Sequence, residues 1–159
     1  MLLDLSELQE TGSFKEVNSP YEVANFEYRQ RNIESPEDFH LEITIYSTKD
    51  SFILSGNLKG ELVIACSRCL EKFVYKVDIK LEEELPKDDI PDFTEVDIGH
   101  ILNDSLLLAI PPKPLCSDDC NGLCAKCGQN LNHAECECEK EVIDPRLAKL
   151  EKLLEDDKE

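Results

Sequence analysis

The sequence predicts an α+β protein, in which an antiparallel β-sheet is packed by one buried helix and followed by a small cysteine-rich zinc lobe and a terminal helix. Long runs of alternating apolar and polar residues predict the sheet, because half-buried strands have a period of two. A later stretch with apolar residues at helical spacing predicts the helix. Six of the eight cysteines then fall within 114–138. We therefore expect a sheet domain at 1–113 and a zinc-knuckle segment with an amphipathic helix at 114–159.

The strand pattern is clearest from Phe39 onward. Residues 39–45 alternate strictly, and a second strand begins at 52–54. The Gly-Asn pair at 56–57 predicts a bend or bulge. Alternation continues over 58–66 and, after a short link, over 73–81. Because the links are short, these strands should pair in antiparallel fashion, without crossover helices.

The buried helix is expected at about 97–110. Asp97 is a candidate N-cap, and Pro111-Pro112 ends the pattern. One stripe contains Ile98, Ile101, Leu102, Ser105, Leu106 and Ala109, and Leu107, Leu108 and Ile110 widen it. A helix with so wide an apolar face should be well buried against the sheet.

The two ends of the chain carry weaker patterns. Residues 1–8 could form a strand that adds to a sheet or a docking segment, and 19–32 fit a helix or a strand. Near the C-terminus, Asp144 is a candidate N-cap and Pro145 suits the first helical position. The apolar stripe of this last helix consists of Leu147, Leu150, Leu153 and Leu154.

Charge and composition narrow the function. The formal net charge is −18, from 17 basic and 35 acidic residues. Such a chain is unsuited to non-specific nucleic-acid binding and suited to attracting basic partners, although an acidic surface can also serve solubility alone. The N-terminal residues do not resemble a signal peptide, and no apolar run reaches the about 18 residues of a membrane span, so no membrane partner is expected. We expect a cytoplasmic protein, whose reduced cysteines are metal ligands before they are disulfides.

The cysteine spacing points to zinc. Cys124 and Cys127, followed by Gly128, have the spacing of a zinc knuckle, which turns both sulfurs toward one point. Cys136 and Cys138 are two residues apart, so in an extended segment both face the same side. These four cysteines are the first choice for a Zn²⁺ site.

Cys116, Cys120, Cys66 and Cys69 leave two interpretations open. They could form a second zinc site that ties the sheet to the C-terminal lobe. Alternatively, one metal takes four of the six C-terminal sulfurs, and the others are spare. His133 could replace one sulfur, although a histidine at a loop tip is more often solvated. All-sulfur coordination leaves no open position for water, so the metal should serve folding and not catalysis.

The pair Cys66 and Cys69 also has a redox interpretation. Redox pairs with this spacing usually lie at a helix N-terminus after a strand, whereas this pair lies between two alternating strands, which disfavours a thiol oxidoreductase. Arg68, between the two cysteines, could contact a phosphate or an acidic group, or could simply be solvated. Clustered cysteines can also hold iron–sulfur clusters, which leaves an iron–sulfur protein as another alternative.

Three segments together resemble one family. They are CSRCLEKF at 66–73, VDIGHILNDSLLLAIPPKPLC at 96–116, and CNGLCAKCGQNLNHAECECEKEVIDPRLAKLEKLL at 120–154. Their order and spacing resemble the YceD family, the large ribosomal RNA subunit accumulation proteins. The resemblance implies a non-enzymatic role, bacterial or organellar, in producing or stabilising 23S ribosomal RNA. It implies a metal site within 116–138 and assigns no catalytic residue.

The resemblance and the charge must be reconciled. A chain with a net charge of −18 is a poor general RNA binder. We therefore expect it to bind a basic partner, such as a ribosomal protein or an rRNA-processing factor, and no small-molecule substrate. Contact with 23S rRNA or a pre-50S particle would then be limited to a small basic spot, for which the candidates are Arg68, Lys72, Lys76 and Lys80. A structural zinc module for protein interactions, unrelated to ribosomes, is the remaining alternative.

Overall fold

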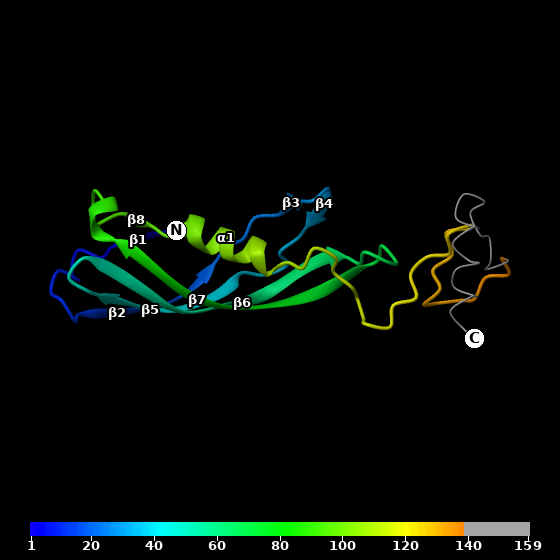
Figure 1. Cartoon of the computed structure of the whole chain (residues 1–159), viewed down its shortest axis with the longest axis horizontal. Coiled ribbons are helices and arrows are strands. Elements are labelled where there is room, and N and C mark those ends of the chain that lie inside the picture. Colours follow the sequence, from blue (N-terminus) through cyan, green and yellow to red (C-terminus); the bar gives the residue numbers. More distant parts are fainter. Residues whose placement is uncertain (139–159) are drawn as a thin grey trace, which may run out of the picture. The chain divides into compact units, whose positions relative to one another are not determined.

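The computed structural model describes residues 1–138. The chain divides into two compact units, Met1–Cys120 and Asn121–Glu159. Residues 114–120, which follow the helix, are therefore grouped with the sheet. The terminal helix expected from Asp144 onward lies outside the described residues. Figure 1 traces the chain and its elements.

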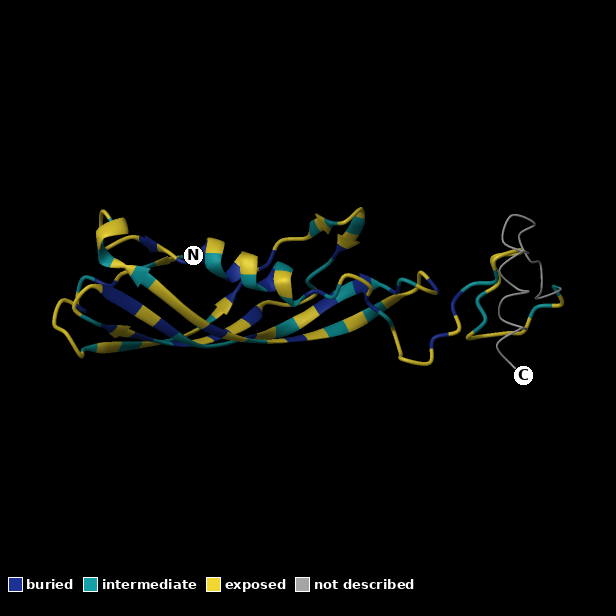
Figure 2. Cartoon of the chain, viewed as in Figure 1, coloured by how far each residue is buried: buried dark blue, intermediate teal, exposed yellow. Residues whose placement is uncertain are grey.

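The main sheet has four antiparallel strands in the order β2-β5-β6-β7. They are β2 (Phe14–Tyr21), β5 (Phe39–Ser47), β6 (Ser51–Ala65) and β7 (Lys72–Pro86). Their side chains alternate between buried and exposed positions, which Figure 2 shows as bands along the strands. The antiparallel sheet expected from the alternation is therefore confirmed, and β6 and β7 pair along their whole length.

Strand β6 does not bend at Gly56-Asn57, so that expectation was wrong. Both residues keep their partners in β5 and β7. A Cβ atom at Gly56 would lie 2.0 Å from the carbonyl oxygen of Glu42, and one at Gly60 would lie 2.5 Å from the ring of Phe39. Glycine at these two positions allows β5 and β6 to approach each other closely. A glycine inside a strand can mark such a close approach as well as a bulge.

Short elements complete the first unit. Near the N-terminus, β1 (Leu2–Leu3) pairs with β8 (Val96–Asp97) in a two-stranded ribbon separate from the main sheet. The segment 19–32, for which the sequence allowed a helix or a strand, forms strands. It contains the end of β2, the whole of β3 (Phe26–Tyr28) and the start of β4 (Arg31–Ile33), and β3 pairs with β4. A single 3₁₀ turn, η1 (Lys87–Asp89), follows β7.

The helix α1 (Gly99–Ala109) is the α-helix of the described residues. It begins two residues after Asp97, whose carboxylate still accepts the N–H of Gly99 at 2.8 Å and the Met1 amino group at 3.0 Å. Leu102 and Leu106 are buried, as the stripe predicts, but Leu108 is 86% exposed. The apolar face is therefore narrower than expected, because Leu108 lies on the side of the helix that faces away from the sheet.

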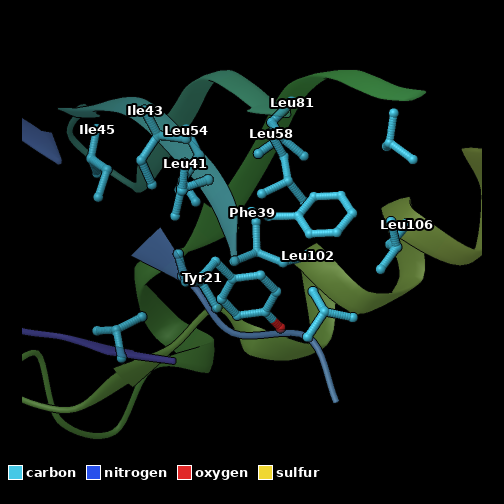
Figure 3. Packing of buried hydrophobic residues seen from close by; sticks show 14 of the residues in the cluster. Tyr21, Phe39, Leu41, Ile43, Ile45, Leu54, Leu58, Leu81, Leu102 and Leu106 are labelled. Atoms are coloured by element: carbon cyan, nitrogen blue, oxygen red, sulfur yellow. The ribbon is translucent and has the colours of Figure 1, made fainter. Parts of the chain in front are cut away.

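The core of the first unit lies between the sheet and α1 (Figure 1). Phe39, Leu58 and Leu81 from the strands meet Leu102 and Leu106 from the helix (Figure 3). The Tyr75 hydroxyl donates to the Ala109 carbonyl at 3.2 Å and so fixes the C-terminal end of α1 on β7. None of the helices within residues 1–138 is long and apolar enough to cross a membrane.

Candidate metal centres

The eight cysteines lie in two groups of four. The hairpin cluster consists of Cys66, Cys69, Cys116 and Cys120, and the C-terminal cluster consists of Cys124, Cys127, Cys136 and Cys138. Within each group the four sulfur atoms lie within 4.8 Å of one another. A tetrahedral zinc ion with Zn–S bonds of about 2.3 Å requires sulfurs about 3.8 Å apart, so each cluster could hold a metal ion.

The hairpin cluster is built from two segments of the first unit. Cys66 and Cys69 come from the turn between β6 and β7, and Cys116 and Cys120 follow α1. The Cys66 and Cys120 sulfurs are 3.7 Å apart, as are those of Cys69 and Cys116. Cys66, Cys69 and Cys120 are almost fully buried, while Cys116 is exposed. Phe73 and Leu115 pack against the cluster, so apolar side chains support it.

The turns at Cys66 and Cys124 share one hydrogen-bond pattern. In the hairpin cluster, the N–H of Leu70 donates to the Cys66 carbonyl at 3.1 Å, and the Cys66 N–H donates to the Glu71 carbonyl at 2.9 Å. In the C-terminal cluster, the N–H of Gly128 donates to the Cys124 carbonyl at 2.9 Å, and the Cys124 N–H donates to Gln129 at 2.8 Å. Both turns therefore have the same knuckle-like backbone pattern, although the sequence predicted a knuckle only at Cys124.

The residue after the second cysteine of each knuckle has a left-handed backbone. Leu70 has φ +63° and Gly128 has φ +75°. The need for a positive φ explains the glycine, as the sequence predicts. Leu70 meets the same need with a side chain that is 65% exposed. The C-x-x-C-G pattern does not identify the knuckle at Cys66, because leucine stands there in place of the glycine.

Arg68 fastens the two segments of the hairpin cluster. One guanidinium nitrogen, Nη1, donates to the Cys120 carbonyl at 2.9 Å and to the Asp118 carbonyl at 3.2 Å. The Ser67 N–H donates to the Pro114 carbonyl at 2.8 Å. The Arg68 guanidinium thus holds the segment after α1 against the knuckle. From the sequence, Arg68 could contact a phosphate or an acidic group or be solvated. Its contact with these carbonyls was not predicted, because the return of the segment 114–120 to this turn leaves no periodic signal.

The C-terminal cluster has different surroundings. Its cysteines are exposed or half-buried. Asparagines organise the loop between its two pairs: the Asn132 side chain accepts the Asn121 N–H at 2.7 Å, and the Asn130 side chain accepts the Asn132 N–H at 3.0 Å. Leu131 donates its N–H to the Gly122 carbonyl at 2.9 Å. Residues 121–138 contain no apolar cluster, so short polar turns hold these sulfurs together.

One thiol in each knuckle ionises easily. Burial acts to raise the pKa of Cys66, but N–H groups of Cys69 and Arg68 point at its sulfur and lower the pKa to about 6. The N–H groups of Cys127 and Lys126 likewise lower the pKa of Cys124 to about 6. Each cluster therefore presents a thiolate near neutral pH, which is the form that binds metal.

A second thiol in each cluster holds its proton. The N–H of Glu71 acts to lower the pKa of Cys69, but burial and the neighbouring sulfurs raise it to about 12. The sulfur of Cys127 and burial raise the pKa of Cys138 to about 12. Four close sulfurs cannot all carry charge unless a cation neutralises them, so the donor set fits a divalent metal ion.

The surroundings of Cys66 and Cys69 disagree with a redox role. Their exposed fractions are 1% and 3%, and they lie at a hairpin turn, away from the N-terminus of α1. A redox thiol needs access to its substrate. A closed set of four sulfurs likewise leaves no position for water or substrate on a bound metal.

The predicted basic spot on β7 is electrically mixed. Lys72 forms an ion pair with Glu34, and Asp78 pairs with Lys59 at 3.7 Å. Lys76 lies opposite Glu61 in the pairing of β6 with β7. Because acidic groups alternate with the lysines on this face, it presents no continuous positive patch.

The comparisons with known proteins give the family. Residues 54–154 match the family described as Large ribosomal RNA subunit accumulation protein YceD. An uncharacterized protein of Mycobacterium tuberculosis is 31% identical over 127 residues, which cover 72% of this chain and 61% of the relative. YlbN of Bacillus subtilis, also called uncharacterized, is 33% identical over 113 residues, which cover 64% of this chain and 66% of that protein.

A chloroplast protein of Arabidopsis thaliana, named Large ribosomal RNA subunit accumulation protein YCED homolog 1, is 37% identical over 65 residues. These cover 41% of this chain and 20% of the plant protein. The chain spans about 61% of the length of the mycobacterial relative. No solved structure matches it. The family match covers most of the chain, including all eight cysteines, and confirms the resemblance seen in the sequence: the chain belongs to the YceD family of large ribosomal RNA subunit accumulation proteins.

Proposed function

We propose that this protein is a non-enzymatic factor that supports accumulation of 23S ribosomal RNA during formation of the large ribosomal subunit. The family match over residues 54–154 is the observation that carries this proposal. The plant relative is named a large ribosomal RNA subunit accumulation protein. The closed four-sulfur clusters support a role in binding, because they offer no open metal position for chemistry.

We further propose that the hairpin cluster and the C-terminal cluster each bind one Zn²⁺. Sulfur-to-sulfur distances of 3.7 Å in the hairpin cluster suit tetrahedral thiolate coordination. Tetrahedral four-sulfur sites select zinc or iron, so metal identity needs a direct measurement. Zinc thiolates require a compartment that keeps thiols reduced, such as the cytoplasm.

The partner we propose is a basic protein of the assembling particle, or the particle itself. The net charge of −18 supports this, because an acidic surface is attracted to cationic protein segments and repelled by bare RNA. The exposed face of β7 also disfavours binding to bare RNA. Asp78 on β7 and Glu61 on the paired strand β6 lie next to its lysines.

The test is depletion of the protein in its own host, with the ratio of 23S to 16S rRNA as the readout. We expect the ratio to fall and to recover with the wild-type gene. Affinity capture at moderate salt should recover large-subunit precursors with their proteins. A normal 23S level after complete depletion would contradict the proposal. A colourless purified protein with zinc by elemental analysis would exclude iron.

A further inference from the structure

A groove lies beside α1, and no cysteine is among its lining residues. Its volume is about 550 Å³. One wall is the helix, with Asn103, Leu106 and Leu107, and the other is the chain from Tyr21 to Tyr28. The Tyr21 hydroxyl donates to the Asn103 side chain at 3.0 Å, which joins the two walls at one end. Both walls of the groove belong to the first unit.

The chain that forms the second wall has unpaired backbone groups. Tyr21 is the last residue of β2 to pair with β5, and Phe26 is the first residue to pair with β4. Between them, Glu22, Val23 and Ala24 make no backbone hydrogen bond within residues 1–138. Backbone N–H and C=O groups that make no hydrogen bond within the protein can pair with an added strand.

The groove has an apolar interior and an acidic edge. Val23 and Leu106 are buried in its walls, and Phe26 and Leu107 are half-buried. Glu22 and Glu27 line it and are exposed. No lysine or arginine is among its lining residues. The occupant that complements these walls has apolar side chains on one side and cations on the other.

We propose that this groove binds an extended peptide in which basic and apolar residues alternate, and that the peptide pairs with the backbone of Glu22–Ala24. Side chains of a strand alternate between two faces, so apolar residues would enter the groove while the intervening cations meet Glu22 and Glu27. The inference rests on the proposed function, because it assigns the contact with a basic partner to one surface.

The experiment uses the full zinc-loaded chain and overlapping peptides that cover the basic proteins of a bacterial large ribosomal subunit. Peptides with alternating basic and apolar residues should bind, and fluorescence anisotropy should give their affinities. Leu107→Arg should weaken binding at least tenfold, because it places a like charge in the groove. Leu108→Arg, on the exposed side of the same helix, is the matched control for added charge and should leave the affinity unchanged.

A second variant and a backbone probe guard against misfolding. Glu22→Lys combined with Glu27→Lys changes exposed residues only and should also weaken binding at least tenfold. N-methylation of alternate amides in the best peptide should abolish binding if its backbone pairs with the chain. Hydrogen exchange at Glu22–Ala24 should slow when the unmodified peptide binds.

The proposal would be overturned if Leu107→Arg and Leu108→Arg weakened binding equally. It would also be overturned if binding survived N-methylation in both alternate registers, or if none of the peptides bound. Self-association blocked by Leu107→Arg would assign the groove to a second copy of the chain and overturn it too. Depletion distinguishes the two proposals: a fallen 23S level without peptide binding removes the groove assignment alone, whereas a normal 23S level removes the ribosomal role.

Discussion

The hairpin cluster and the C-terminal cluster contain the same knuckle in opposite surroundings. In the hairpin cluster, three of four cysteines are almost fully buried, and Arg68 joins its two segments. In the C-terminal cluster, the cysteines are exposed or half-buried, and asparagine side chains organise the loop. The knuckle turn therefore does not depend on burial, and what differs is how much other structure supports the sulfurs.

The difference predicts different roles for the metal. A sheet with a continuous core can fold without a metal, so zinc at the hairpin cluster should add local rigidity to a formed structure. Residues 121–138 have no apolar cluster among them, so zinc should supply most of their folding free energy.

Removal of zinc should have the largest effect. Because structural zinc contributes an apparent free energy of about 10–16 kcal/mol, a strong chelator should unfold residues 121–138 and leave the main sheet folded. Hydrogen exchange measures this: the amides of Gly128 and Leu131 should lose protection, while those at Leu41 and Leu58 keep it. Zinc added back should restore the protection. Protected amides at Gly128 and Leu131 in metal-free protein would show that the segment folds alone.

Cysteine substitutions should separate the two clusters. Native mass spectrometry should find two zinc ions in the wild-type chain and one in either double variant, Cys66→Ser with Cys120→Ser or Cys124→Ser with Cys136→Ser. Only the first pair should lower the melting temperature of the sheet, because only that cluster is built on β6 and β7. Two zinc ions retained by both variants would contradict the assigned ligands.

Arg68 and Lys126 occupy equivalent positions in the two knuckles. Arg68→Met should weaken zinc binding at the hairpin cluster about tenfold, because the bonds to the Asp118 and Cys120 carbonyls orient the metal-binding loop. Lys126→Met is the matched control, and zinc affinity at the C-terminal cluster should be unchanged. Competition with a chromophoric chelator measures both, and equal effects at both positions would remove the positioning role of Arg68.

The smallest effect is expected from exchange of the left-handed residues. Gly128→Leu should destabilise its knuckle by about 1–2 kcal/mol, because a left-handed backbone is unfavourable for a residue with a Cβ atom. Leu70→Gly should stabilise the other knuckle by less than about 1 kcal/mol, since the relief of strain is partly offset by the greater freedom of glycine in the unfolded chain. Zinc affinity measures both changes. Equal effects of the same sign would show that the φ angles do not matter.

The sequence predicted the elements better than their assembly. Alternation predicted β5 and β7 because it depends only on which side of a strand is buried. The grouping of Cys116 and Cys120 with Cys66 and Cys69 stayed open, because it depends on where the chain returns after α1. Leu108 was expected in the core and is exposed, because apolar spacing alone does not give the width of the contact with the sheet.

The ribbon of β1 and β8 has a consequence for folding order. Strands β5, β6 and β7 are successive hairpins, whose contacts are local and can form early. Met1 and Asp97 are 96 positions apart, so their contact closes a far longer loop than the hairpin turns and bears a larger entropic cost. During synthesis the first residues emerge long before their partners. Residues 2–3 therefore cannot pair with β8 until all four strands of the main sheet have been synthesised.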